Sequence, residues 1–265
     1  MAETAGIGIG VAVNSVVVPV TGTPEFITRS EARMINTNGG MKAVDSHASL
    51  ITLEGRTEFW ADAATFEDIC DLINDTAGAL TDFTAAIGTY TQTGCKATNL
   101  TLNAAVGEAL KGSLSWMATA KGTGTDPGAP ASVETFTCIS LTATAIGATV
   151  HASTIDLTVA NGVKAVHSMN ATGSRLPVAL AEGAQAVTFN IKLTDIPSVP
   201  TDITGALSKI ASVTMAFTST GAAPKTLTIT LTNCLPTEQS LTDSIDDILM
   251  HGVNYSAESV DWAIA

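Results

Sequence analysis

The residues that could do chemistry are few in this chain of 265 residues, and they lie far apart in the sequence. No histidine stands in an H-x-E or H-E-x-x-H context, and no two cysteines have the C-x-x-C spacing of metal and redox sites. The histidines are His47, His151, His167 and His251, and the cysteines are Cys70, Cys95, Cys138 and Cys234. We therefore expect surface or packing histidines, small buried cysteines, and neither a metal nor another cofactor.

Two further patterns resemble fragments of enzyme sites but lack the context that such sites need. Asp246 and Asp247 are adjacent, and on a strand their side chains would point to opposite faces, so they could not share a proton or a substrate. The segment GIGIG at residues 6–10 is followed by valines, whereas a dinucleotide-binding loop needs a strand before it and a helix after it. These patterns give no support to an enzyme, and we expect none.

Charge and composition exclude further classes of function. The chain has 12 basic and 25 acidic residues and a net charge of −13, so it would repel a polyanion rather than clamp it. Its aromatic residues, 5% of the total, are too few and too scattered to form a sugar-binding platform or to stack on bases. The N-terminal segment contains Glu3 and no basic region, and no apolar run reaches the roughly 18–20 residues of a membrane helix. We therefore expect a protein that is made and kept in the cytoplasm.

Alternation of polar and apolar residues predicts mainly β-structure around this sparse chemistry. A strand is expected at residues 46–59, and a short helix at residues 65–75, in which Phe66, Ile69, Cys70 and Ile73 recur at i, i+3, i+4 and i+7. Thr65 and Asp68 resemble a capping box at the start of this helix. Residues 94–120 then predict a β-hairpin with an apolar face that packs in the core. This face comprises Leu100, Leu102, Leu114 and Trp116.

The second part of the chain repeats this order of elements. A second short helix is expected where Ile203, Ala206, Leu207 and Ile210 repeat the apolar spacing of the first helix with a constant offset of 137 residues. We therefore predict two tandem β-sandwich or β-barrel units, each with a short flanking helix. The expected divisions are an N-terminal arm and extended loop at residues 1–46, a first β unit at 47–120, a linker at 121–132 and a second β unit at 133–265.

The hairpin carries the most informative resemblance. The segment GCKATNLTLNAAVG, followed by LKGSLSWMATAKG, resembles the tail tube (major tail) proteins of long-tailed viruses of bacteria and archaea. The segments VETFTCISLTATAIGATVHASTIDLTVANGV and SRLPVALAEGAQAVTFNIKLTD resemble the second half of two-domain members of that family. The resemblance covers roughly residues 47–255. It implies β-barrels or sandwiches with a flanking helix, whose sheets join between subunits into rings.

The resemblance also implies partners and a place. Rings would stack into a hollow tail tube that encloses a tape-measure protein, conducts the viral genome during ejection, and meets tail terminator and distal tail proteins. Such a tube belongs to the virion tail and is assembled in the host cytoplasm. Because the chain looks duplicated, we expect a trimer with pseudo-sixfold symmetry rather than a hexamer.

Candidate functional residues follow from this hypothesis. Acidic side chains near strands and turns would face the lumen and repel DNA, which would pass without specific binding. These candidates are Glu54, Glu58, Glu108, Asp156, Asp195 and Asp247. The arm and the Asn- and Gly-rich loop that follows it would contact the next ring. The loop candidates are Met34, Asn36, Asn38, Gly39 and Gly40.

Other functions remain open on the sequence alone. A cell-surface β-sandwich module, such as an adhesin or a carbohydrate-binding domain, fits the strands and the abundance of threonine. The missing export signal and the sparse aromatic residues weigh against it. Another virion component, such as a capsid-decorating or contractile-tail protein, would share much of the same pattern, and a hydrolase is a more distant alternative.

Overall fold

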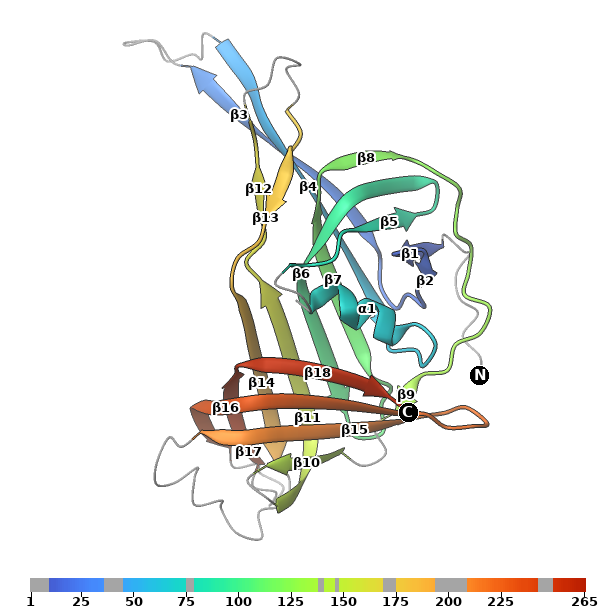
Figure 1. Cartoon of the computed structure of the whole chain (residues 1–265), viewed down its shortest axis with the longest axis vertical. Helices are drawn as coiled ribbons and strands as arrows, with labels where there is room; N and C mark the ends of the chain where they lie inside the picture. Colours follow the sequence, from blue (N-terminus) through green and yellow to red (C-terminus); the bar gives the residue numbers. More distant parts are fainter. Residues whose placement is uncertain are drawn as a thin grey trace.

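The structure of this protein is a computed structural model that describes residues 10–35, 45–74, 79–137, 141–145, 148–168, 175–193, 209–242 and 250–265. Within these ranges the fold is mainly β, with one short helix, a large antiparallel sheet of 16 strands and a separate two-stranded sheet (Figure 1). The prediction of a mainly β protein is confirmed.

The elements follow one another along the chain with short connections in most places. In order they are β1 (Val11–Val13), β2 (Val16–Val17), β3 (Glu25–Ile35), β4 (Asp45–Trp60), α1 (Phe66–Ile73), β5 (Phe83–Ile87), β6 (Tyr90–Ala105), β7 (Lys111–Ala118), β8 (Ala120–Thr123), β9 (Phe136–Thr137), β10 (Leu141–Ala145), β11 (Ala148–Asn161), β12 (Lys164–Val166), β13 (Ala179–Ala181), β14 (Gln185–Leu193), β15 (Ile210–Ser219), β16 (Thr226–Thr242), β17 (Met250–Ala257) and β18 (Ser259–Ile264).

Eight strands form the part of the large sheet that matters most for function, and we call them the central sheet. They lie in the order β3, β4, β7, β6, β11, β14, β17, β16, each antiparallel to its neighbours. The pairing of β6 with β11 joins the N-terminal part of the chain to the C-terminal part. In Figure 1, β6, β7, β11 and β14 run along the long axis of the molecule, while β15 and β18 cross the lower ends of these strands.

Two long strands leave the central sheet and continue into a second layer. The first residues of β6 pair with β5 and β8, whereas the residues from Lys96 onward pair with β7. In the same way the first part of β16 pairs with β15 and β18, and its last part pairs with β17. Gly94 (φ 58°) and Asn233 (φ 50°) lie at the two changes of partner. A left-handed residue bends a strand sharply, so each strand turns a corner there.

The helix α1 packs on the core side of the central sheet, against β6 and β11, and also against β18 (Figure 1). Its residues Phe66, Ile69, Cys70 and Ile73 are buried, as the predicted spacing requires. The expected capping role of Thr65 is wrong, because its side chain makes no capping hydrogen bond to the helix. The carboxylate of Asp62 instead accepts hydrogen bonds from the backbone N–H of Ala64 and the hydroxyl of Thr65.

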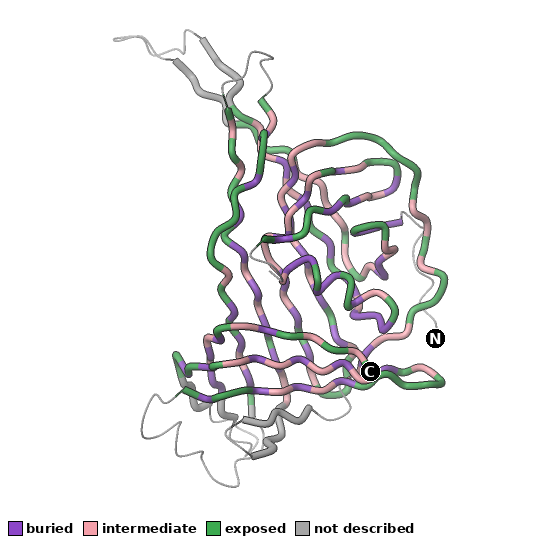
Figure 2. The backbone as a smooth tube through the Cα atoms, viewed as in Figure 1, coloured by how far each residue is buried: buried purple, intermediate pink, exposed green. Residues whose placement is uncertain are grey.

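The interior holds one main apolar core, in which buried residues follow the strands at every second position (Figure 2). The free thiols of Cys70, Cys95 and Cys234 are buried within it, as predicted, whereas Cys138 lies outside the described residues. Burial of the charged form raises the pKa of Cys95 to about 12 and that of Cys234 to about 11, so these thiols are protonated and unreactive at neutral pH.

The prediction of a second helix has a mixed outcome. Residues 194–208, which contain Ile203, Ala206 and Leu207, lie outside the described residues. Ile210 is the first residue of β15 and pairs with Cys234, so its assignment to the helix is wrong. The segment expected to be an arm also contains β3, which pairs along its length with β4.

Candidate functional site

One face of the central sheet is mostly polar, and we call it the polar face. Residues opposite each other on antiparallel strands point to the same side, so the strand registers define its members. Its polar members are Glu25 and Arg29 on β3; Thr52, Glu54, Arg56 and Glu58 on β4; Lys111, Ser113 and Ser115 on β7; Asn99, Thr101 and Asn103 on β6; Thr154, Asp156 and Thr158 on β11; Thr188, Asn190 and Lys192 on β14; Asn254 and Ser256 on β17; and Glu238 on β16. A smaller number of apolar residues share this side, and they are Ile27, Trp60, Ala105, Met117, Ala160, Ala186 and Leu235. All eight strands thus contribute polar residues to the polar face.

The opposite side of the same strands is the buried face. Leu100, Leu102, Leu114 and Trp116 lie there, each at most 2% exposed. The indole N–H of Trp116 donates to Gln92 Oε1 at 2.8 Å, and Gln92 Nε2 donates to the backbone carbonyl of Glu54 at 3.1 Å. This buried pair of hydrogen bonds fixes the orientation of the largest side chain in the core.

Space for that indole comes from a glycine on the neighbouring strand. Gly55 lies opposite Trp116, and a Cβ at position 55 would be 2.3 Å from the Cε2 atom of the indole ring. The edges of Phe26 and Phe83 complete the packing, with ring centroids 6.2 Å and 6.1 Å from that of Trp116. The indole of Trp116 on β7 is therefore fixed from both neighbouring strands, by Gly55 on β4 and by Gln92 on β6.

Acidic and basic side chains are interleaved on the polar face. Arg29 Nε is 2.9 Å from Glu54 Oε2, and Arg56 Nε is 3.1 Å from Glu25 Oε2. Asn103 Nδ2 donates to Asp156 Oδ1 at 2.6 Å, across the junction between β6 and β11. The face therefore offers water a dense array of hydroxyl, amide and paired charged groups, and it has no basic patch of the kind that grips phosphates.

The structure brings together some of the residues expected to line a lumen. Glu54, Glu58 and Asp156 all lie on the polar face, on β4 and β11. Glu108 lies in the turn between β6 and β7, where its carboxylate is 3.7 Å from Lys111 Nζ. Asp195 and Asp247 lie outside the described residues.

The expected inter-ring loop is only partly described. Met34 belongs to β3, where it pairs with Ser46 of β4. The other candidates lie outside the described residues, and they are Asn36, Asn38, Gly39 and Gly40.

The sequence reasoning missed most of the polar face because it searched for acids alone. It overlooked Arg29 and Arg56, and it gave no weight to the threonines, serines and asparagines between the apolar residues of each strand. A signal was present, because NLTLN, TIDLTV and VTFNIK each alternate polar and apolar residues over their whole length. Alternation of this kind marks a sheet with one solvated face.

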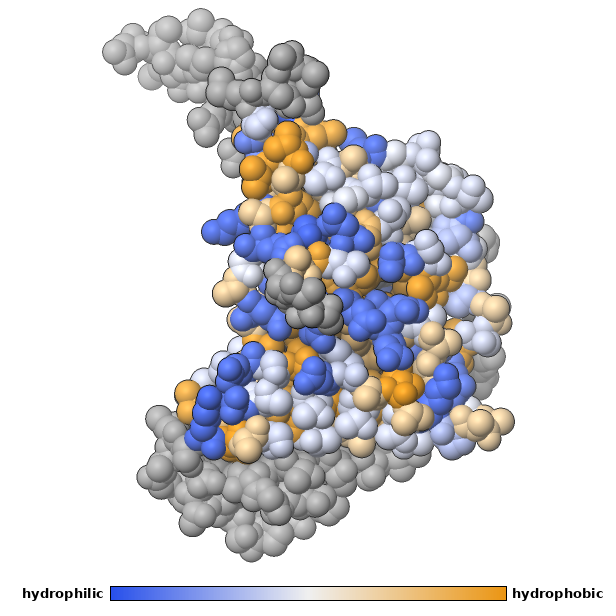
Figure 3. Space-filling model, in the orientation of Figure 1, coloured by the Kyte–Doolittle hydropathy of each residue, from blue (hydrophilic) through white to orange (hydrophobic). Residues whose placement is uncertain are grey.

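One end of the molecule carries a projecting extension, formed by the far ends of β3 and β4 together with β12 and β13 (Figure 1). The backbone N–H of Ile51 donates to the carbonyl of Arg175 at 2.9 Å and so ties the two parts together. Leu50, Val166 and Val178 are exposed near its base, and Figure 3 shows a group of hydrophobic residues just below the grey atoms at this end. Exposed apolar groups that gather in one place are typical of a contact surface.

A cluster of charges fixes the base of this extension to β6. Lys96 Nζ lies 2.5 Å from Glu182 Oε1 and 3.0 Å from Asp82 Oδ1, and it donates to the carbonyl of Leu80 at 2.9 Å. Partial burial lowers the pKa of Lys96, but its two carboxylate partners outweigh this effect and the pKa is raised. The hydrogen bond from Lys96 in turn lowers the pKa of Glu182.

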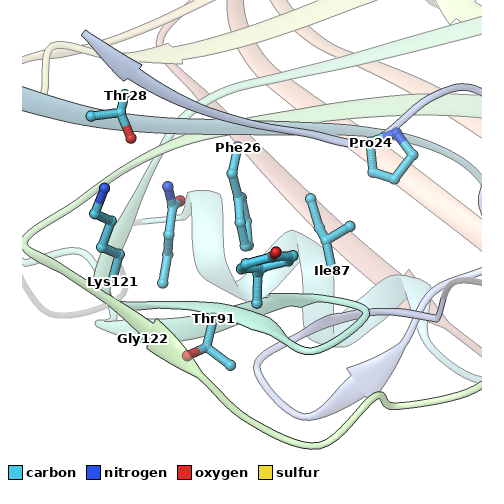
Figure 4. Close-up of a pocket in the computed structure, with 9 residues that line it drawn as sticks. Pro24, Phe26, Thr28, Ile87, Thr91, Lys121 and Gly122 are labelled. Carbon is cyan, nitrogen blue, oxygen red and sulfur yellow. The ribbon is translucent and has the colours of Figure 1, made fainter.

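A pocket of about 360 Å³ opens between β3, the turn from β5 to β6, and β8 (Figure 4). Phe26 and Ile87 point into it, together with Thr28 and Lys121 from the surrounding strands. Its lining contains no carboxylate, imidazole or thiol. The pocket therefore lacks the paired acid and base that hydrolysis requires.

The described residues contain no group of three or more His, Cys, Asp or Glu side chains placed to hold a metal ion. None of the helices in those same ranges has the length and hydropathy needed to cross a membrane.

Comparison with known proteins adds one finding. A family model described as "Phage tail tube protein" matches residues 5–262. A search of curated proteins finds no match.

Proposed function

Since this chain belongs to the phage tail tube protein family, we propose that the polar face of its central sheet lines the lumen of the tail tube. The family assignment makes the chain a structural component of the virion tail that assembles with its own copies into a tube, and not an enzyme. The single observation that carries the proposal is the eight-stranded sheet with one mostly polar face and one buried face, on which α1 packs against β6 and β11. A wall must have one side that meets the contents and another that meets the core of the subunit.

The chemistry of the polar face suits a conduit for DNA. Hydroxyl, amide and paired ionic groups keep their hydration, and the basic patches that would hold phosphates are missing from the described part of the face. Glu54, Glu58, Glu108 and Asp156 would then face the genome, and we extend this role to Asp195 and Asp247. In this proposal DNA passes without specific binding, and before ejection the same lumen encloses a tape-measure protein.

A tandem duplication accounts for the arrangement of the strands. Six pairings of the N-terminal part have counterparts in the C-terminal part, and this repetition supports two related β units. The matched pairs are β1–β5 with β10–β15, β3–β4 with β11–β14, β4–β7 with β14–β17, β5–β6 with β15–β16, β6–β7 with β16–β17, and β6–β8 with β16–β18.

Individual residues support the same proposal. An offset of 139 residues relates Gly94 to Asn233, the two left-handed corner residues, and also Cys95 to Cys234, which are both buried. On this basis the first unit includes β1–β3 as well as residues 47–120. The linker at 121–132 follows the start of β8, and the second unit occupies residues 133–265.

A duplicated chain favours a ring of three copies with pseudo-sixfold symmetry. Three copies of an eight-stranded central sheet would give 24 strands. With strands about 4.8 Å apart and tilted by about 40°, such a barrel would be about 48 Å across at the backbone, which leaves room for duplex DNA inside the side chains. Counting the subunits of a ring by native mass spectrometry tests this, and six copies per ring would overturn it.

The projecting extension is the proposed contact between stacked rings. The proposed contact includes the loop candidates Met34, Asn36, Asn38, Gly39 and Gly40, together with the exposed apolar residues Leu50, Val166 and Val178. Deletion of residues 34–46 should leave subunits that form rings but no longer stack into tubes. Tubes of normal length from the deleted protein would exclude this role. At the tube ends, the terminator and distal tail proteins would occupy the same surfaces.

Electron microscopy of the purified protein, together with genome ejection from virions, tests the proposed lumen. Hollow tubes are expected from the wild-type chain, and monodisperse monomers would contradict the ring. Charge reversal at Glu58 should slow ejection while tubes still form, because phosphates would then meet a cation in the wall. The matched control is reversal of Glu67, which lies on α1, away from the polar face. Equal ejection rates for the two variants would contradict the assignment of the lumen.

A further inference from the structure

We propose that the ring closes through one defined strand pairing, in which β3 of one copy pairs with the last part of β16, residues 235–242, of the next copy, with Arg29 opposite Glu238. This inference rests on the proposed function and names the surface through which two copies meet.

The two ends of the central sheet are open edges. Among the described residues, β3 pairs with β4 alone, and residues 235–242 of β16 pair with β17 alone. An open strand edge offers a row of unpaired N–H and C=O groups, and proteins cover such edges or pair them with another chain. One chain therefore carries two edges at opposite ends of the same sheet, which is the arrangement that a closed ring of identical copies needs.

The junction of β6 with β11 provides the template for the missing pairing. Within its own unit, β6 pairs with β5, β7 and β8, as β16 pairs with β15, β17 and β18. Both strands also carry a register shift against the next strand, between Ala97 and Asn99 in β6 and between Pro236 and Glu238 in β16. The strand that β6 joins across the junction is β11, and the counterpart of β11 in the first unit is β3. The last part of β16 is therefore the counterpart of the β6 segment that pairs with β11. By the same template, we expect it to pair with β3 of the next copy.

The registers fix which residues correspond on the β3 side. Met117 and Ser256, which differ by the offset of 139, lie opposite Glu54 and Thr188 respectively. Glu54 in turn lies opposite Ile27 of β3, and Thr188 lies opposite Thr158 of β11. Ile27 therefore corresponds to Thr158.

The same correspondence, two residues further along each strand, relates Arg29 to Ala160. Ala160 lies opposite Asn99 in the β6–β11 junction, and Glu238 takes the place of Asn99 in β16. Transfer of the junction therefore places Arg29 of one copy opposite Glu238 of the next.

The predicted pair is chemically matched. The side chain of Arg29 is 66% exposed and holds Glu54 through one nitrogen, so its remaining N–H groups are available to a second carboxylate. Glu238 is exposed and accepts a hydrogen bond from Asn254 Nδ2 at 2.9 Å, which holds its carboxylate on the polar face. Opposite charges on facing residues of antiparallel strands stabilise the pairing and select its register.

Disulfide trapping tests the register directly. Facing residues of antiparallel strands have Cα atoms about 4.5–5.5 Å apart, within the range of a disulfide. The variant Arg29→Cys/Glu238→Cys should therefore give covalent oligomers up to the ring size on a non-reducing gel after mild oxidation. The matched control is Thr52→Cys/Glu238→Cys, because Thr52 faces Arg29 from β4 and would lie two strands, about 10 Å, from Glu238. This control should give no more cross-linking than the wild type.

A charge exchange provides the second measurement, for the case that cysteines disturb assembly. Glu238→Arg alone should reduce ring formation at least tenfold, since two arginines would then face each other. Addition of Arg29→Glu should restore it. Wild-type tubes combined with absent cross-linking, or with no rescue by the exchange, would overturn the pairing and leave the proposed function intact. Absence of rings in the wild type would overturn both.

Discussion

The two faces of the central sheet are built on the same strands, yet they perform opposite tasks. On the buried face, Trp116 packs against Gly55 and two phenylalanines, and its one polar atom is paired with Gln92. On the polar face, one residue away along the same strand, Ser115 lies opposite Arg56. The difference teaches that stability and function are separated by a single step along the backbone. One face fixes the shape of the sheet, and the other, in the proposed tube, would face what passes along the lumen.

The largest expected change in the free energy of unfolding comes from a substitution on the buried face. Trp116→Ala should lower the free energy of unfolding by about 3–5 kcal/mol, because it leaves a cavity in a site that neighbouring strands hold open. Urea denaturation of unassembled subunits measures the change. Ser115→Ala, on the polar face of the same strand, is the control and should change it by less than about 0.5 kcal/mol. Equal losses in the two variants would remove the contrast between the faces.

A smaller effect is expected when the indole stays and only its hydrogen bond is lost. Gln92→Leu leaves the buried N–H of Trp116 without an acceptor and should cost about 1–3 kcal/mol in the free energy of unfolding. The combined change Gln92→Leu/Trp116→Phe should recover part of that loss, because the orphaned donor is then gone. A double variant less stable than the sum of the two single changes would contradict this explanation.

Glu182 and Lys96 form an ion pair at the base of the extension. The dependence of stability on pH tests their contribution. Glu182 has a lowered pKa, so its contribution to stability is present above its ordinary value of 4.5 and is lost as pH falls through the folded pKa. Lys96 has a raised pKa, so its contribution is present below 10.5 and is lost as pH rises through its folded value.

The backbone N–H of Leu80 donates to Glu182 at 3.0 Å and provides a local probe. Its NMR shift should titrate with a midpoint below pH 4.5. Lys96→Met should move that midpoint upward, while the spectrum of the central sheet stays unchanged at neutral pH. A midpoint that does not move in this variant would show that Lys96 is not the cause of the lowered pKa.

The smallest effect is expected on the polar face itself. Glu58→Gln removes one exposed charge without changing the shape of the side chain, and the free energy of unfolding should change by less than about 0.5 kcal/mol. Thermal unfolding of the subunit checks this. A loss above 1 kcal/mol would mean that the polar face contributes to the fold as the buried face does.

The sequence was sufficient to predict strands and helices where one periodicity of apolar residues dominates. The hairpin of β6 and β7 overlaps the predicted residues 94–120, and α1 lies within the predicted residues 65–75, because alternation and the i, i+3, i+4, i+7 spacing dominate there. By contrast, β3 has the sequence EFITRSEARMI, in which charged residues break the alternation, and it was expected to be part of an arm.

Pairings between strands that lie far apart along the chain could not be predicted from the sequence. The junction of β6 with β11 joins residues 53 positions apart along the chain at Asn103 and Asp156, and no local pattern specifies it. The ion pairs of Arg29 and Arg56 depend on the register between β3 and β4, so they too required the structure. The polar face is a property of eight aligned strands, whereas the sequence presents those strands one at a time.

The corners at Gly94 and Asn233 have a mechanical meaning for the assembled particle. At each corner one strand passes from the central sheet into the second layer without leaving its own chain. In the proposed tube, a load on the central sheet would therefore pass to the second layer through covalent bonds rather than through side-chain contacts alone. When the tail flexes, we expect the strain to concentrate at these two backbone positions in every copy. In a tube of stacked rings, these two backbone positions would recur at regular intervals as sites of elastic bending.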